Sequence, residues 1–155
     1  MAAAHHFAVS VEWTGNRGTG TSAYRAYGRQ NVITGQGKQP IDGSSARVFH
    51  GDVERWNPEE LLIAALSECH MLSYLHSAVK AGVTITGYTD DATGTMDQEG
   101  DGGRFSEVIL RPRVVLEDES QRALADSLHR EASENCFIAS SVNFPVRHEP
   151  VRPVG

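Results

Sequence analysis

The feature that most constrains the fold is an apolar, helix-forming segment that carries a thiol. Residues 61–78 read LLIAALSECHMLSYLHSA, and the apolar side chains recur at helical spacing. Asn57 and Pro58 are typical of a helix start, because asparagine caps the first turn and proline fits the first helical position. Gly82 is typical of a helix end. The pattern predicts one helix of roughly 24 residues, from Pro58 to the residue before Gly82.

This helix is apolar on nearly every side, which is typical of a helix buried on more than one face. A chain of 155 residues offers limited cover for so long an apolar helix. The pattern therefore favours a homodimer, in which a second copy covers the remaining face. The alternative is that strands of the same chain wrap the helix on their own.

Before this helix, the sequence predicts strands. Alternating polar and apolar residues, rich in β-branched and aromatic types, favour strands over about 6–13 and 22–34. A loop is expected over 35–45, and a short strand over 46–52.

After the helix, two strands are expected at 83–97 and 104–118, joined as a hairpin by the acidic, glycine-rich turn between them. A second helix is predicted over 119–135, and a final short strand over 141–150. On that second helix, one apolar series is expected to run through Leu124, Leu128, Ala132 and Cys136. The order predicts a single α+β domain over residues 1–155 and not a βαβ array.

Charge and hydropathy exclude some classes of partner. The net charge is −6 and the sequence pI is about 5.6, which argues against a nucleic-acid partner. No apolar run has the length needed to cross a bilayer, so no membrane association is expected. The first residues lack the basic start and long apolar centre of a signal peptide, so a cytoplasmic location is expected.

The two cysteines, Cys69 and Cys136, lie far apart in the sequence. They form no CxxC pair that would indicate a zinc ribbon, and a structural disulfide is not expected in a reducing compartment. In apolar surroundings a thiol has a raised pKa and is inert, so a reactive Cys69 requires a nearby cation. The candidates are Arg17, Arg47, Arg55 or a histidine. The simpler interpretation is that Cys69 is a small buried apolar residue.

A metal site is a further alternative, because several histidines accompany Cys69 in the sequence: His50, His70, His76, His129 and His148. His70 and His76 are six residues apart, so they lack the i, i+4 spacing of a helical zinc motif. Cys69 and His76 share a helical face but are two turns apart. A metal site would therefore need ligands from other elements.

The segment NPEELLIAALSECH resembles a helix of the OsmC/Ohr family, the osmotically inducible and organic hydroperoxide resistance proteins. The residues that carry this resemblance are Asn57, Pro58, Glu59, Leu61, Ala64, Ala65 and Cys69. The second family cysteine matches Cys136 in SENCFIASSVNFPV, and the order of elements agrees over nearly the whole chain.

The resemblance implies an α+β fold in which β-sheets wrap around long central helices of an intertwined homodimer. It implies a thiol-dependent peroxidase that reduces organic hydroperoxides and also hydrogen peroxide. Cys69 would be the peroxidatic cysteine and Cys136 the resolving one. An external thiol or dithiol would act as the reductant, and no metal or bound organic cofactor would be needed.

The resemblance also implies that Glu59 pairs with an arginine that activates the thiol. Arg47 resembles the OsmC-type arginine and Arg17 the one of the hydroperoxide resistance type; Arg47 is preferred. Glu59 and Cys69 are separated by roughly 15 Å along one helix, so Glu59 would come from the second subunit. Phe137 stands where the family often has proline, which indicates a divergent branch. The alternatives are a non-catalytic binding protein of this fold and a Cys/His metal or redox sensor.

Overall fold

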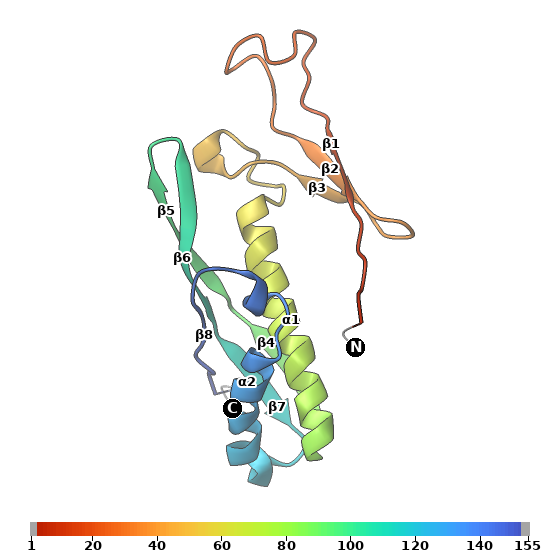
Figure 1. Ribbon diagram of the computed structural model, residues 1–155, viewed down its shortest axis with the longest axis vertical. Helices are drawn as coiled ribbons and strands as arrows, with labels where there is room; N and C mark the ends of the chain where they lie inside the picture. The colour runs from red at the N-terminus through yellow and green to blue at the C-terminus, as the bar shows by residue number, and fades with distance from the viewer. Residues whose placement is uncertain (1–2, 153–155) are drawn as a thin grey trace. The chain divides into compact units, whose positions relative to one another are not determined.

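The computed structural model describes residues 3–152, which form two compact units. The N-terminal unit ends at Leu61 and the C-terminal unit begins at Leu62. The boundary falls within the first turn of helix α1 (Pro58–Ala81). Figure 1 follows the chain through both units. The prediction of a single domain over 1–155 stays a prediction.

The N-terminal unit contains a three-stranded antiparallel sheet. Its strands are β1 (Ser10–Trp13), β2 (Asn31–Thr34) and β3 (Ile41–Gly43), in the order β1-β2-β3. The strand expected over 6–13 is confirmed only from Ser10 onward.

The strand expected over 22–34 is wrong before Asn31, where the chain makes turns instead. These turns are closed by a tight backbone approach, in which Gly28 donates its N–H to the Gly15 carbonyl oxygen at 2.8 Å. A Cβ atom at Gly15 would lie 2.0 Å from the Gly28 oxygen, so this approach requires glycine.

The short strand expected over 46–52 is also wrong. Residues Arg47–Phe49 form a 3-10 turn, and His50 follows in the left-handed region with a φ of 63°. Local hydrogen bonds explain this turn: Phe49 donates its backbone N–H to the Ala46 carbonyl oxygen at 2.9 Å, and Ser45 Oγ donates to the Phe49 carbonyl oxygen. The alternating pattern of this segment is therefore not a strand signal.

Helix α1 has the predicted bounds. The Asn57 side chain accepts a hydrogen bond from the Glu60 N–H at 2.8 Å, and the chain leaves the helix at Gly82 with a φ of 70°. One stripe of the helix is buried: Leu66, His70, Tyr74, Ser77 and Ala78. Other faces are exposed within a single chain, with Leu72 56% and Val79 79% exposed. Burial on more than one face, as predicted, is not found within one chain.

The C-terminal unit contains two small sheets. Strand β4 (Ile85–Asp90) pairs with β7 (Pro112–Leu116), and β5 (Thr93–Glu99) forms a hairpin with β6 (Gly102–Leu110). Strand β8 (Val146–His148) adds to β6 in parallel and is shorter than expected. The predicted hairpin is confirmed.

Each of the two long strands expected after α1 is divided between the two sheets. The break is held by Asp90, whose carboxylate accepts hydrogen bonds from the Arg111 N–H and from Ser67 Oγ. A single carboxylate thus joins the end of β4, the link between β6 and β7, and helix α1.

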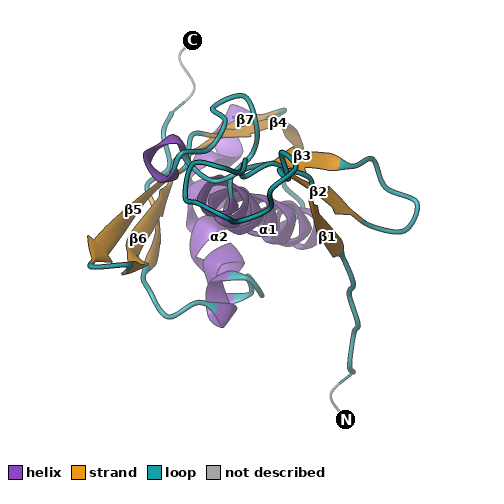
Figure 2. Cartoon of the chain, turned by 90° about the horizontal axis from the view of Figure 1, so that it is seen from above, coloured by secondary structure: helices purple, strands orange, loops and turns teal. Residues whose placement is uncertain are grey.

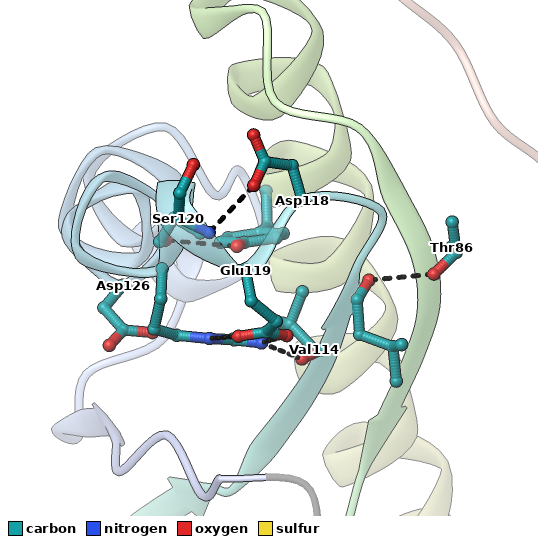
Figure 3. A network of polar contacts seen from close by, with 10 residues as sticks. Thr86, Val114, Asp118, Glu119, Ser120 and Asp126 are labelled. Carbon is teal, nitrogen blue, oxygen red and sulfur yellow. Dashed lines mark hydrogen bonds and ion pairs between the residues drawn. The ribbon is translucent and has the colours of Figure 1, made fainter.

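Helix α2 covers Arg122–Glu134 and follows a 3-10 turn at Glu119–Gln121, so the expected helix start is too early. Arg122 fixes this start: it donates to the Val114 carbonyl oxygen at 3.0 Å and binds Glu119, as Figure 3 shows around the labelled Val114 and Glu119. Asp118 accepts from the Ser120 N–H. Arg122 therefore ties the start of α2 to β7.

The apolar series predicted for α2 is buried at Leu128, Ala132 and Cys136 but not at Leu124. Ala125, Leu128, His129 and Ala132 are buried, whereas Leu124 is 43% exposed. Figures 1 and 2 show α2 alongside α1, and Tyr74 on α1 donates its hydroxyl hydrogen to the Ala125 carbonyl oxygen. The main core lies between these helices and the β4–β7 sheet. No helix within residues 3–152 is long and apolar enough to cross a membrane.

Candidate thiol site

Both cysteines are free thiols, and the C-terminal unit brings them together. Cys69 is half-buried on α1, and Cys136 is 1% exposed, two residues beyond the end of α2. The Cys69 side chain lies close enough to Cys136 to help raise the pKa of that thiol. Helices α1 and α2 pack side by side. Cys69 and Cys136 are therefore neighbours, although they lie far apart in the sequence.

The surroundings of Cys136 keep this thiol protonated near neutral pH. Burial raises its pKa, the contact with Cys69 raises it further, and the Ala139 N–H, 3.5 Å from Sγ, lowers it. The net result is a Cys136 pKa of about 11. No charged side chain of residues 3–152 is among the groups that shift it. Cys136 therefore does not act as a thiolate in this reduced state.

The expected partner residues lie in the N-terminal unit. Arg17 and Arg47 are exposed, and neither makes an ion pair with any other residue in the described part of the chain. Arg55, the third candidate, forms an ion pair with Asp42 at 3.4 Å, so its charge is already balanced by a carboxylate. The Glu59 side chain has a buried oxygen, Oε2, with no hydrogen-bond partner among residues 3–152. A buried carboxylate oxygen normally accepts a hydrogen bond. Glu59 Oε2 is therefore a candidate to accept one from a donor outside these residues.

The residue after Cys69 belongs to a cluster of three histidines that the sequence did not predict as a unit. His70 on α1 and His129 on α2 are each 2% exposed, and Nε2 of His70 lies 3.1 Å from Nδ1 of His129. Their rings are stacked 5.4 Å apart, and His148 of β8 lies 5.5 Å from His70. Tyr74 stacks on His129 with ring centroids 4.2 Å apart.

Burial keeps these imidazoles neutral. It lowers the pKa of His70 to about 4 and that of His129 to about 3, with the neighbouring histidines adding to both shifts, and it also lowers the pKa of His148. Stacked rings do not direct three nitrogen atoms at one point. Over residues 3–152, no group of three or more His, Cys, Asp or Glu side chains is arranged to hold a metal ion. The signal that could have revealed the cluster is the position of His70 between Leu66 and Tyr74 in the buried i, i+4 series.

Comparison with known proteins identifies the family. A family model described as OsmC-like protein matches residues 50–150. An OsmC-like protein of unknown function from Vibrio cholerae has 30% sequence identity and a TM-score of 0.86, with 96% of this chain and 100% of that one covered.

Two further relatives are more distant. An uncharacterized protein of Bacillus subtilis, YmaD, is 26% identical over 144 residues, which are 89% of this chain and 87% of that protein. An organic hydroperoxide resistance protein OsmC from Legionella pneumophila shares the fold at 16% identity, with a TM-score of 0.69 and coverage of 99% and 100%. The α+β fold expected from the sequence is confirmed, and the chain belongs to the OsmC-like protein family.

Proposed function

We propose that this protein is a thiol-dependent peroxidase that reduces organic hydroperoxides, with Cys69 as the peroxidatic and Cys136 as the resolving cysteine. The observation that carries the proposal is the closeness of the two thiols, since the Cys69 side chain contributes to raising the pKa of Cys136. Neighbouring cysteines can form a disulfide once one of them is oxidised. The hydroperoxide resistance protein of similar fold supports the same class of chemistry.

The reaction proceeds in three balanced steps. The Cys69 thiolate attacks the distal oxygen of the hydroperoxide, the O–O bond breaks, and the alkoxide takes a proton and leaves as the alcohol. Cys69 is then a sulfenic acid. The sulfur of Cys136 attacks it, an S–S bond forms, and the hydroxyl group leaves as water with the Cys136 proton. An external dithiol reduces the disulfide and restores both thiols.

The differing environments of the two thiols support these roles. The half-buried Cys69 is accessible to a small substrate, whereas Cys136 is buried and protonated. A thiol with a raised pKa attacks a peroxide poorly, because the thiolate is the nucleophile. The raised pKa thus disfavours Cys136 as the peroxidatic residue, and its position beside Cys69 suits it to the resolving role.

Activation of Cys69 is assigned to an arginine that pairs with Glu59, with Arg47 preferred over Arg17. Both guanidinium groups lack ion pairs, and Glu59 Oε2 lacks a donor, within the described residues. Since about 15 Å separates Glu59 from Cys69 along α1, Glu59 would reach the thiol from a second subunit.

A homodimer is part of the proposal. The exposed face of α1 carries two large apolar side chains, Leu72 and Val79, and beside Val79 there is a cavity of about 400 Å³ lined by residues from Leu75 to Ile85. Apolar side chains exposed in this way are typical of a subunit interface. A second copy of α1 is the expected occupant.

The test is consumption of an organic hydroperoxide by the purified protein in the presence of a dithiol such as dihydrolipoamide. Cys69→Ser should abolish turnover. Ser73→Ala, one turn further along α1, is the matched control and should keep the wild-type rate. Equal rates for wild type and Cys69→Ser would reject the enzyme and leave a non-catalytic binding protein of this fold.

The resolving role has a separate test. Under excess hydroperoxide without reductant, wild type should gain an internal disulfide, with a mass loss of two hydrogens. Cys136→Ser should instead gain oxygen atoms, because Cys69 passes from sulfenic to sulfinic acid. If intact-mass spectrometry shows the same products for both proteins, Cys136 does not resolve.

A further inference from the structure

We propose that the N-terminal unit contains a binding site for a small organic oxyanion with at least two negative charges, of the phosphate-ester or polycarboxylate type. The site is an open surface pocket of about 370 Å³ lined by Arg17, Arg25, Tyr27, Arg29 and His50, and we call it the arginine pocket. It lies wholly within the N-terminal unit. The inference goes beyond the proposed peroxidase and does not rest on it.

The concentration of positive charge is the first argument. Three guanidinium groups line one cavity in a chain whose net charge is −6. None of the three makes an ion pair with a carboxylate of residues 3–152. Like charges brought together without a counter-ion repel one another, so an arrangement of this kind is stabilised when an anion binds.

Arg29 is held in place for binding. Its guanidinium donates to the Tyr27 carbonyl oxygen at 2.9 Å and to the Tyr24 carbonyl oxygen at 3.0 Å. It also stacks on the rings of Tyr27, at 4.2 Å, and Tyr24, at 4.7 Å. A guanidinium has five N–H donors, and these two contacts leave others for an oxyanion in a fixed orientation.

The turns that carry the other charged residues are also ordered by specific contacts. The Asn16 side chain accepts the N–H groups of Gly18 and Gly20 at 2.9 and 3.0 Å, which shapes the turn at Arg17. His50 has a φ of 63°, the one positive value for a non-glycine residue in the described part of the chain. Its ring meets Tyr24 edge-on at 5.4 Å. This backbone conformation is unfavourable for histidine, and here it brings the imidazole to the pocket.

Size indicates an organic ligand. A volume of about 370 Å³ lies within the range of small-molecule sites, roughly 300–1,000 Å³. Tyr27 is the one aromatic side chain among these lining residues apart from the His50 imidazole. Bidentate hydrogen bonds from arginine suit both carboxylate and phosphate oxygens. The pocket therefore fits a small molecule that carries several such oxygens.

Titration calorimetry of the full chain with pyrophosphate and with citrate tests the proposal. At least one of the two probes should bind wild type at low ionic strength and more weakly as sodium chloride is added. Binding of pyrophosphate alone assigns a phosphate ester, and binding of citrate alone assigns a polycarboxylate. If neither probe binds at millimolar concentration, the proposal is wrong.

Arg25→Gln should weaken binding at least about tenfold, since one charge-assisted hydrogen bond is lost. Arg25→Glu should abolish it through repulsion. Arg25 is exposed, so both variants should keep the fold, as circular dichroism can check. The controls are Arg104→Gln and Arg104→Glu, which make the same charge changes at an exposed position near the start of strand β6. If the Arg25 and Arg104 variants bind equally well, the arginine pocket is not the site.

Discussion

The buried pair of histidines makes the stability of the fold depend on pH. His70 and His129 are neutral in the folded chain, with pKa values lowered to about 4 and about 3 by burial and by neighbouring histidines, His148 among them. In the unfolded chain both return to about 6.5. Below that pH the unfolded state binds more protons than the folded state. The stabilisation is therefore full above pH 6.5 and is lost as the pH falls, down to the folded pKa of each ring.

The size of the effect follows from these values. Each unit of difference in pKa corresponds to about 1.4 kcal/mol. Between pH 7.5 and pH 5, the linkage amounts to up to about 2 kcal/mol for each histidine, and so to about 4 kcal/mol for the pair. A domain of this size is typically stable by about 5–15 kcal/mol, so the loss is a large fraction of the total.

Replacement of His129 isolates this contribution. In His129→Asn, an amide group takes the place of Nδ1, which lies 3.1 Å from His70 Nε2. Urea unfolding at pH 7.5 and pH 5 should show a loss of about 4 kcal/mol for wild type and about 2 kcal/mol for the variant, because one titrating group is gone. The difference between the two pH values is the readout, since lost stacking on Tyr74 lowers stability at both.

His76→Asn is the matched control, because His76 is exposed on the same helix as His70. It should lose as much stability as wild type between the two pH values. The reasoning is refuted if wild type is equally stable at pH 7.5 and pH 5, or if His129→Asn has the same pH dependence as wild type.

Two further predictions concern the faces of α1. Leu66 is fully buried within one chain, so Leu66→Ala should destabilise the fold by about 2–5 kcal/mol. Urea unfolding measures the loss, and an unchanged stability would contradict the placement of Leu66 in the core. Val79→Asp should convert the proposed homodimer to a monomer, because a buried unpaired carboxylate is costly at an apolar interface. Light scattering measures the mass, and an unchanged mass would mean that this face of α1 is not the interface.

The sequence predicted those elements whose signals are local. Asn57, Pro58 and Gly82 predicted the ends of α1 because caps act within one turn of the chain. The segment before β2 was predicted wrongly because its conformation depends on contacts between turns. There, Arg29 binds the carbonyl oxygens of Tyr24 and Tyr27, and no pattern of alternation encodes such bonds.

In the candidate site, too, local features could be predicted from the sequence and contacts between distant elements could not. The nearness of Cys69 and Cys136 was expected only from the family resemblance, since helical spacing does not determine how α1 and α2 pack. The histidine cluster was missed because its members come from three elements, α1, α2 and β8. Within α1, however, the buried stripe that includes His70 follows directly from helical periodicity.

The neutral histidine cluster cannot supply the positive charge that would activate Cys69. His70 is adjacent to Cys69 in the chain, yet with a pKa of about 4 it carries no charge near neutral pH and provides no electrostatic stabilisation for a thiolate. Cys136 is neutral as well. A reactive Cys69 therefore requires a cation from outside this cluster, and that requirement is the physical reason for proposing a guanidinium group in this role.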